Sequence, residues 1–230
     1  MQNRQESVKP MIDWAAVDTV LLDMDGTLLD LYYDNYFWNE YLPEKWGLLR
    51  GMDAETARTV LMPRLRAHEG KLSWYCLDYW SRELEIDILA LKADIEHLIR
   101  VRPHVHEFLS FLNETGKRSI LVTNSHEKLL SIKLERTGIG HCFDAVVSSH
   151  ALGLPKEEVG FWDRFSRLHP FDAERTLFID DNVAVLRAAR AYGIRHLLTI
   201  RQPDSRAAAR PPCEFQALSA FSEICARERA

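Results

Sequence analysis

TVLLDMDGTL, residues 19–28, joins a short apolar run to two closely spaced carboxylates, Asp23 and Asp25. An apolar run of this length predicts a strand that is buried on both faces, as in a parallel sheet. A turn explains part of the polar segment after the run, with Asp25-Gly26 as turn formers and Asp23 as a capping residue. Two acids directly after a buried strand repel each other, however, unless a cation or a shared proton compensates. The pattern therefore favours a functional site over a simple turn.

The rest of the chain repeats this pattern of a strand followed by a helix. Further apolar runs lie at residues 119–123, 145–149, 176–180 and 196–200, and helical patterns lie at 104–115, 126–137, 156–168 and 183–192. This alternation predicts an α/β fold, a Rossmann-like doubly wound parallel sheet with right-handed crossovers. Open sheets of this kind bind ligands at the carboxyl ends of their strands.

One segment interrupts the alternation, since residues 31–100 contain no convincing strand. They predict four helices, at about 35–46, 54–68, 73–84 and 88–100, with prolines that blur the limits of the first two. A crossover needs far fewer residues, so this segment is expected to be an inserted helical subdomain. The predicted core comprises residues 11–30 and 101–204. Residues 1–10 and 205–230 are expected to be peripheral tails, the second with one helix at most.

A second acidic pair, Asp180-Asp181, ends the run at 176–180. Capping of the next helix by Asp181 or Asn182 would explain one acid and leave the other unexplained. If the two strands are neighbours, Asp23, Asp25, Asp180 and Asp181 converge at one edge of the sheet. Oxygen ligands of this kind suit Mg²⁺. A carboxylate beside Mg²⁺ can attack a phosphoryl group, and a second one can act as general acid and base.

Two further motifs are candidates for phosphate binding. Thr123-Asn124 ends the run at 119–123 and precedes a helix, where hydroxyl and backbone N–H groups suit a phosphate oxygen, although helix capping is an equal alternative. Lys156 opens a predicted helix. An anion would offset its unfavourable interaction with the helix dipole. Taken alone, Lys156 is more simply explained as a solvated surface lysine.

Taken together and in this order, the four motifs resemble those of the haloacid dehalogenase superfamily of phosphotransferases. The resemblance implies that Asp23 is the nucleophile and Asp25 the general acid and base. It implies that Thr123 and Lys156 hold the phosphoryl group. Asp180, with or without Asp181, would join Asp23 and the Asp25 carbonyl at Mg²⁺. The helical insertion would then be a cap of the C1 type.

A closer resemblance, to the bacterial GMP/IMP nucleotidases of this superfamily, rests on longer stretches. These are VLLDMDGTLLDLYYDNYFW at 20–38, LSWYCLDYWS at 72–81, GLPKE at 153–157 and ERTLFIDDN at 174–182. This resemblance implies hydrolysis of purine nucleoside 5′-monophosphates. A phosphomutase, or a phosphatase of small sugar phosphates or phosphoglycolate, is the alternative on the same core. A silent scaffold should have lost an obligatory residue, and a dehalogenase should lack the counterpart of Asp25.

The inserted segment is rich in aromatic residues, which make up 11 of residues 31–80. Such rings either fill the core of a small helical subdomain or stack on a nucleotide base. We expect one or more of four rings to border the leaving group: Tyr36, Trp38, Trp74 and Tyr75.

Composition limits the remaining possibilities. The net charge of −5 gives no electrostatic case for binding nucleic acid or an anionic membrane. No apolar run approaches the roughly 20 residues of a membrane span. The polar first ten residues do not resemble a signal peptide, so a cytoplasmic location is expected. The four cysteines form no paired motif and are expected to be reduced and mostly buried. A small phosphate ester is the expected partner, and no obligatory protein partner is implied.

Overall fold

The computed structural model describes residues 11–225. The predicted leader at 1–10 and the end of the predicted tail, 226–230, lie outside these residues. Six strands form a parallel sheet in the order β3-β2-β1-β4-β5-β6. They are β1 Thr19–Leu22, β2 Arg118–Thr123, β3 Ala145–Ser148, β4 Thr176–Ile179, β5 His196–Ile200 and β6 Gln216–Leu218. The predicted doubly wound α/β sheet is confirmed, and its first five strands lie within one residue of the predicted runs.

Helices cover both faces of this sheet. They are α7 Val105–Glu114, α8 Glu127–Thr137, α9 Ser149–Leu152, α10 Val159–Leu168 and α11 Val183–Tyr192. Val20 and Leu22 of β1 belong to the apolar cluster on the side of α7 and α8. Leu21 belongs to the cluster on the side of α10 and α11. Consecutive positions are apolar because each faces a helix layer, and burial of one such side chain stabilises the fold by about 1.5–3 kcal/mol.

The central position of β1 brings the motifs together. β1 pairs with β2 on one side and with β4 on the other, and Leu22 lies opposite both Leu121 and Ile179. Asp23 and Asp180 therefore directly follow two neighbouring strands and lie at the same level along them. Thr123 ends β2 at the same edge. This is the edge at which parallel sheets bind ligands.

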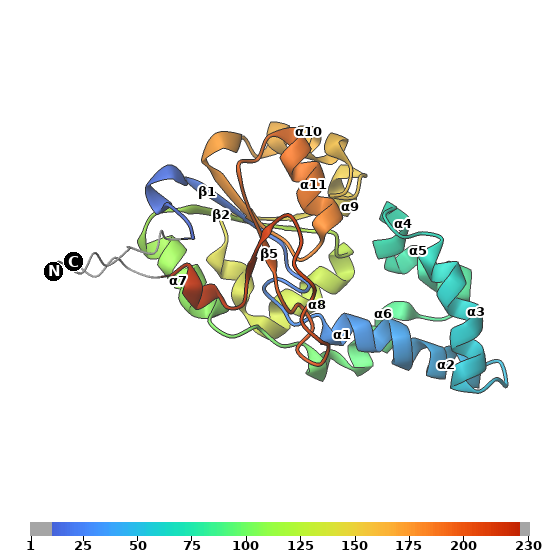
Figure 1. Cartoon of the computed structure of the whole chain (residues 1–230). Coiled ribbons are helices and arrows are strands. Elements are labelled where there is room, and N and C mark those ends of the chain that lie inside the picture. Colours follow the sequence, from blue (N-terminus) through green and yellow to red (C-terminus); the bar gives the residue numbers. More distant parts are fainter. Residues whose placement is uncertain (1–10, 226–230) are drawn as a thin grey trace.

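Residues 31–100 contain helices and no strand. We call this segment the helical insertion, and it forms a separate lobe beside the sheet (Figure 1). Its elements are α1 Tyr32–Tyr36, a π-helical turn Phe37–Tyr41, α2 Leu42–Leu48, α3 Ala54–Arg66, α4 Leu72–Tyr75, α5 Leu77–Leu84, α6 Ile88–Asp94 and a 3₁₀ turn Glu96–Leu98. The domain boundaries at 30/31 and 100/101 stay a prediction.

Proline does not end the first predicted helix of the insertion, but two other predicted helices are interrupted, and the one predicted at 88–100 already ends at Asp94. The first helix continues past Pro43, which lies in the first turn of α2 directly after the π-helical turn, where its missing N–H is not needed. The helix predicted at 73–84 breaks at Cys76, whose backbone is extended with φ −86 and ψ 107. The Cys76 Sγ then accepts a hydrogen bond from the Tyr79 N–H at 3.4 Å and caps α5.

The prediction of a peripheral C-terminal tail is wrong for residues 216–218. They form β6, which pairs in parallel with β5 and buries Leu218. Just beyond it, Phe221 packs against Phe108 of α7 with ring centroids 4.8 Å apart. A three-residue strand is too short to show a periodic pattern in the sequence. Within residues 11–225, no helix is long and apolar enough to cross a membrane.

Candidate active site

A cavity of about 500 Å³ lies between the carboxyl edge of the sheet and the helical insertion. Seven predicted site residues line it from the core: Asp23, Asp25, Thr123, Asn124, Lys156, Asp180 and Asp181. The helical insertion contributes Trp38, Trp74, Tyr75, Lys92 and Glu69, among others. The fold therefore brings all the predicted polar residues to one place. A cavity of this size lies in the usual range for sites that bind small molecules.

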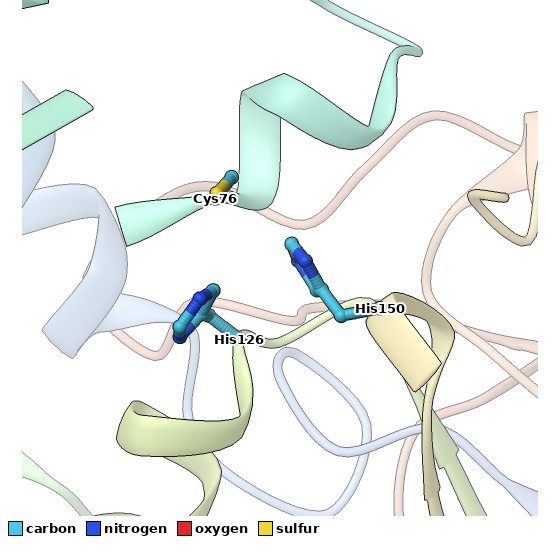
Figure 2. A group of neighbouring side chains, drawn as sticks. All are labelled: Cys76, His126 and His150. Atoms are coloured by element: carbon cyan, nitrogen blue, oxygen red, sulfur yellow. The ribbon is translucent and has the colours of Figure 1, made fainter. Parts of the chain in front are cut away.

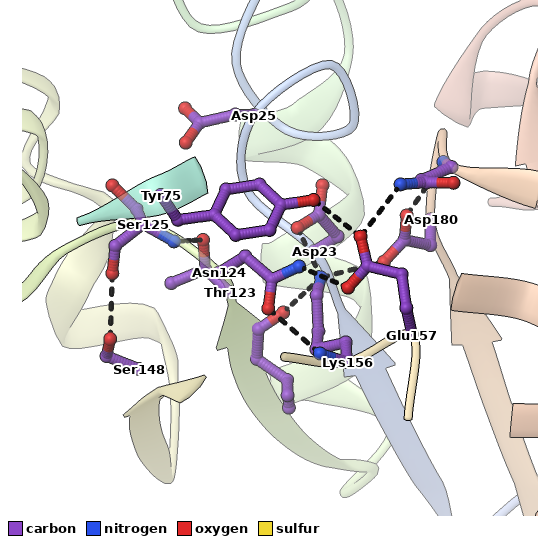
Figure 3. A network of polar contacts seen from close by, with 12 residues as sticks. Asp23, Asp25, Tyr75, Thr123, Asn124, Ser125, Ser148, Lys156, Glu157 and Asp180 are labelled. Atoms are coloured by element: carbon purple, nitrogen blue, oxygen red, sulfur yellow. Dashed lines mark hydrogen bonds and ion pairs between the residues drawn. The ribbon is translucent and has the colours of Figure 1, made fainter. Parts of the chain in front are cut away.

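The polar residues of the cavity form a network of hydrogen bonds and ion pairs, and Lys156 lies at its centre (Figure 3). Its side chain is buried, and its Nζ lies 2.6 Å from Asp23 Oδ1 and 2.7 Å from Asp180 Oδ2. Burial lowers the pKa of Lys156, but the charges of Asp180 and Asp23 outweigh this and raise it, so the amine stays protonated. The alternative of a solvated surface lysine is wrong. α10 begins only at Val159, so Lys156 lies in the preceding loop rather than in the helix.

Three carboxylates crowd beside this lysine. One oxygen each from Asp23, Asp180 and Asp181 lies within 4.8 Å of the others. Burial, the largest cause, and the nearby charge of Asp23 raise the pKa of Asp181 to about 7 and that of Asp180 well above its usual range. The basic groups that pair with these acids within residues 11–225 are Lys156 and Arg210, which lies 2.9 Å from Asp181. An excess of buried negative charge on oxygen ligands is the environment that fits a hard divalent cation such as Mg²⁺.

Gly26 lets the loop after β1 approach these acids. Its φ is +87°, and a Cβ at this position would lie 2.7 Å from the carboxyl group of Asp181. Glycine is therefore required at position 26 for two reasons: the positive φ, and the lack of room for a Cβ beside Asp181.

We expect Gly26→Ala to destabilise the fold more than Gly51→Ala. Both glycines have positive φ, so both changes cost about 1–2 kcal/mol of backbone strain. Only Gly26 would also clash with a buried side chain, because a Cβ on Gly51 meets no atom within 4 Å. Thermal unfolding of both variants measures the difference. An equal fall in melting temperature in the two variants would show that the contact of residue 26 with Asp181 does not contribute to the destabilisation.

Asp25 lies apart from the three crowded carboxylates and begins a chain of ion pairs. Its Oδ1 lies 2.6 Å from the Nζ of Lys133 on α8, which also lies 2.7 Å from Asp34 Oδ2 on α1. The other oxygen of Asp34 lies 2.5 Å from Lys92 Nζ on α6. Burial raises the pKa of Asp25 to about 6, against the opposing charge of Lys133. At neutral pH, its proton can thus be taken up and released.

No sequence motif indicates this chain of ion pairs. Lys133 lies in an amphipathic helix, where a lysine is normally assigned to the solvated face. Lys92 lies in a helix with no recognisable motif, and Asp34 lies in the stretch 20–38, where the resemblance assigns it no role. Burial raises the pKa of Asp34, but the charges of Lys133 and Lys92 outweigh it and lower this pKa to about 2. The ion pairs therefore carry fixed charges from the core into the helical insertion.

The loop after β2 supplies the third part of the site. Thr123 Oγ1 accepts a hydrogen bond from the Ser125 N–H at 3.0 Å. The Ser125 Oγ is buried without a hydrogen-bond partner among residues 11–225, so it can still bind a ligand. The Asn124 side chain accepts from the Lys156 N–H at 3.0 Å and donates to Glu157 at 2.9 Å. Its amide therefore holds the lysine loop in place.

Three of the four candidate rings reach the cavity, namely Trp38, Trp74 and Tyr75. The hydroxyl of Tyr75 donates to Glu157 Oε1 at 2.5 Å and joins the helical insertion to the core (Figure 3). Tyr36 is not among the lining residues and stacks on Tyr32 with ring centroids 5.7 Å apart. The break at Cys76 ends α4 directly after Tyr75, at the boundary with the core.

The chain is similar to known proteins in sequence and in fold. Residues 17–193 match the model of the haloacid dehalogenase-like hydrolases. The GMP/IMP nucleotidase YrfG of Escherichia coli is 44% identical over 84% of this chain and 87% of its own length. A phosphoglycolate phosphatase of Nitrosococcus oceani is 28% identical over 82% of this chain and 91% of its own.

Solved structures support the fold. The HAD phosphatase of Thermococcus onnurineus superposes with a TM-score of 0.74 at 18% identity, over 90% of this chain and 96% of that one. The predicted enzyme class, a phosphoric monoester hydrolase, is confirmed by the family match and by the 44% identical relative. The chain belongs to the haloacid dehalogenase-like hydrolase family.

Proposed function

We propose that this enzyme is a Mg²⁺-dependent phosphomonoesterase that hydrolyses purine nucleoside 5′-monophosphates, GMP and IMP, through an aspartyl-phosphate on Asp23. One observation carries the proposal. Asp25, Lys156 and an acidic cluster formed by Asp23, Asp180 and Asp181 make up the floor of a cavity whose wall on the side of the helical insertion contains three aromatic rings. The floor suits a phosphoryl group and the wall suits a base.

In the first step, Asp23 attacks the phosphorus atom. Lys156 holds its Oδ1 at 2.6 Å, which leaves Oδ2 as the attacking oxygen. The new Oδ2–P bond forms as the bond from phosphorus to the ribose oxygen breaks. Asp25, protonated beforehand, gives its proton to that leaving oxygen. The positive charge of Lys156 stabilises the negative charge of the transferred group.

In the second step, Asp25 takes a proton from a water molecule, which attacks the phosphorus and releases Asp23 and inorganic phosphate. Asp25 is thereby protonated again for the next cycle. Asp23, Asp180, Asp181 and the Asp25 carbonyl would hold Mg²⁺, which when bound supplies charge neutralisation at the phosphoryl oxygens. Thr123 and the free Ser125 hydroxyl would position the same oxygens.

The purine preference rests on the 44% identical nucleotidase and on the aromatic wall of the cavity. Stacking of a base on such a ring contributes about 1–3 kcal/mol. We further propose, from the composition, that the enzyme acts in the cytoplasm on free nucleotides and needs no protein partner.

The alternative is a phosphatase of phosphoglycolate or of a small sugar phosphate, or a phosphomutase. The relative from Nitrosococcus oceani favours the first of these. Release of inorganic phosphate from GMP, IMP, AMP, phosphoglycolate and p-nitrophenyl phosphate separates the possibilities. For a purine nucleotidase, we expect the highest kcat/KM with GMP and IMP. A higher value for phosphoglycolate would replace this function with the alternative.

Metal removal should abolish the activity. We expect turnover to stop with EDTA and to return with Mg²⁺, because the acidic cluster needs a cation to bind a phosphate ester. Ca²⁺ should restore it poorly, since Ca²⁺ prefers more ligands at longer distances and would misplace the attacking carboxylate. Phosphate release in metal-free buffer is the measurement, and full activity there would contradict the assignment.

The aromatic wall can be tested with a single variant. Trp74→Ala should lower kcat/KM for GMP by about tenfold to a hundredfold, the equivalent of roughly 1–3 kcal/mol of stacking. Because remote binding energy also positions the phosphate, kcat should fall together with a rise in KM. Hydrolysis of phosphoglycolate, a minimal ester with no ring to stack, should change much less.

Tyr36→Ala is the matched control, since this ring lies on the same insertion without lining the cavity. It should leave the ratio of the two kcat/KM values unchanged. If Trp74→Ala lowers only the melting temperature and affects both substrates alike, the ring fills the insertion core and does not stack on the base.

A further inference from the structure

Three metal-ligating side chains that the proposed function does not use meet where the helical insertion approaches the core. Cys76 lies between α4 and α5, His126 caps α8, and His150 lies in α9. One ligand atom from each lies within 4.8 Å of the other two. Figure 2 shows the two imidazole rings rising from the core, with the thiol above them on the insertion. These residues are 50 and 24 positions apart, so no sequence motif announces them.

The state of the two histidines favours a ligand. The Nε2 of His150 is buried without a hydrogen-bond partner of normal geometry among residues 11–225, although the backbone of Tyr75 and Asn124 lies nearby. A buried polar atom of this kind destabilises the fold if nothing binds it. The His126 and His150 rings lie 4.9 Å apart. Burial lowers the pKa of His126 and lowers that of His150 to about 4, so both rings are neutral at pH 7.

We propose that Cys76, His126 and His150 bind a divalent cation of the Zn²⁺ type, at a site separate from the acidic cluster. A thiolate and two neutral imidazoles are ligands that Zn²⁺ prefers and Mg²⁺ does not. As the bond from Zn²⁺ to sulfur forms, the thiol proton of Cys76 passes to solvent. The Nδ1 of His126 accepts the Lys128 N–H at 3.4 Å, which leaves Nε2 to bind the cation. The Asp78 carboxylate lies 3.7 Å from that Nε2 and also pairs with Lys128 Nζ at 2.7 Å, so it can compete with water for the fourth position.

A cation at this site would join the helical insertion to the core. Cys76 belongs to the insertion, and both histidines belong to the core. The neighbouring Tyr75 already bonds to Glu157 across the same boundary. Enzymes whose lids enclose the substrate must open to release product. Zn²⁺ bound here therefore holds the cavity closed and slows turnover, a consequence that rests on the proposed function.

Binding can be tested without measuring activity. Co²⁺ added to the Mg²⁺-saturated protein should produce a thiolate-to-cobalt charge-transfer band in the near ultraviolet. The band should reach its maximum at one equivalent of Co²⁺ per protein. Carboxylate ligands cannot give such a band. Cys76→Ser should abolish this band. It should keep the fold, because the serine hydroxyl can accept the Tyr79 N–H in place of the sulfur. His150→Gln should weaken Co²⁺ binding by at least about tenfold.

Cys142→Ser is the matched control. Cys142 is also a thiol beside a histidine, with its Sγ 3.6 Å from the Nε2 of His141. The band should persist in this variant. Absence of the band from the unsubstituted protein, or its persistence in Cys76→Ser, would overturn the site.

The closure of the cavity has its own test. With Mg²⁺ saturating, Zn²⁺ should slow GMP hydrolysis by the unsubstituted enzyme and not by Cys76→Ser. Equal inhibition of both would mean that Zn²⁺ acts at the acidic cluster, and the cross-link would be wrong. If the enzyme hydrolyses no nucleotide but the cobalt band forms as described, the proposed function fails while the metal site stands.

Discussion

Asp23→Asn should abolish phosphate release from every ester, with a loss in kcat on the order of 10⁴-fold or more. The amide cannot attack phosphorus, and it removes one negative charge from the acidic cluster. Asp23 lies between Lys156 and two other buried acids, so its neutralisation removes repulsion as well as an ion pair. We therefore expect the fold to persist, with no large fall in melting temperature.

The matched control is Asp18→Asn, which makes the same change at the opposite end of the same strand. Asp18 is exposed and pairs with Arg175, far from the cavity residues. This variant should hydrolyse GMP at the rate of the unsubstituted enzyme. If Asp23→Asn keeps more than about a hundredth of that rate with an unchanged melting curve, Asp23 is not the nucleophile.

Asp25→Asn should have the second largest effect, a loss of about 10²–10⁴-fold in kcat for GMP. The amide can accept the hydrogen bond from Lys133 but cannot pass on a proton. The ribose oxygen is a poor leaving group and needs that proton, whereas p-nitrophenolate does not. With p-nitrophenyl phosphate, the first step should therefore survive and only the attack of water should be slow.

The result expected for this variant is a burst of one p-nitrophenolate per active site, followed by a slow steady state. Rapid mixing with p-nitrophenyl phosphate and detection of p-nitrophenolate by absorbance give both phases. A uniform loss for both substrates, without a burst, would assign Asp25 a structural role instead of proton transfer.

Local patterns in the sequence are sufficient to predict the core of this enzyme. Apolar runs such as 19–23 can be recognised as strands in the sequence because both faces of a parallel strand are buried, so that consecutive residues are apolar. The acids after β1 and β4 converge because those strands pair in register. These features depend on short segments and on general rules of sheet topology. The sequence alone therefore places Asp23, Asp180 and Thr123 at the ends of strands, and the observed strand order brings these ends to one edge.

Contacts between distant segments cannot be predicted in this way. Lys133 and Lys92 look like surface lysines in amphipathic helices, and only the packing of the insertion on α8 buries both beside Asp34. Arg210 reaches Asp181 because β6 holds the chain after residue 205 against the sheet. The break of the helix at Cys76 cannot be predicted, because neither glycine nor proline marks it in the sequence.

The cysteines illustrate the same limit. The sequence predicts mostly buried thiols, but Cys213 is exposed and Cys76, Cys142 and Cys225 are only partly buried. Their spacing excludes a paired motif, yet Cys76 still meets two histidines from other segments.

Detection of the phosphorylated enzyme tests the central claim most directly. Asp25→Asn is mixed with p-nitrophenyl phosphate, quenched in acid during the slow phase, and digested for mass spectrometry of the peptide that contains residues 19–28. The aspartyl-phosphate mechanism predicts one phosphoryl group per protein, located on Asp23 and absent from the Asp23→Asn, Asp25→Asn double variant. Release of p-nitrophenolate by Asp25→Asn without any phosphoryl group on that peptide would contradict it.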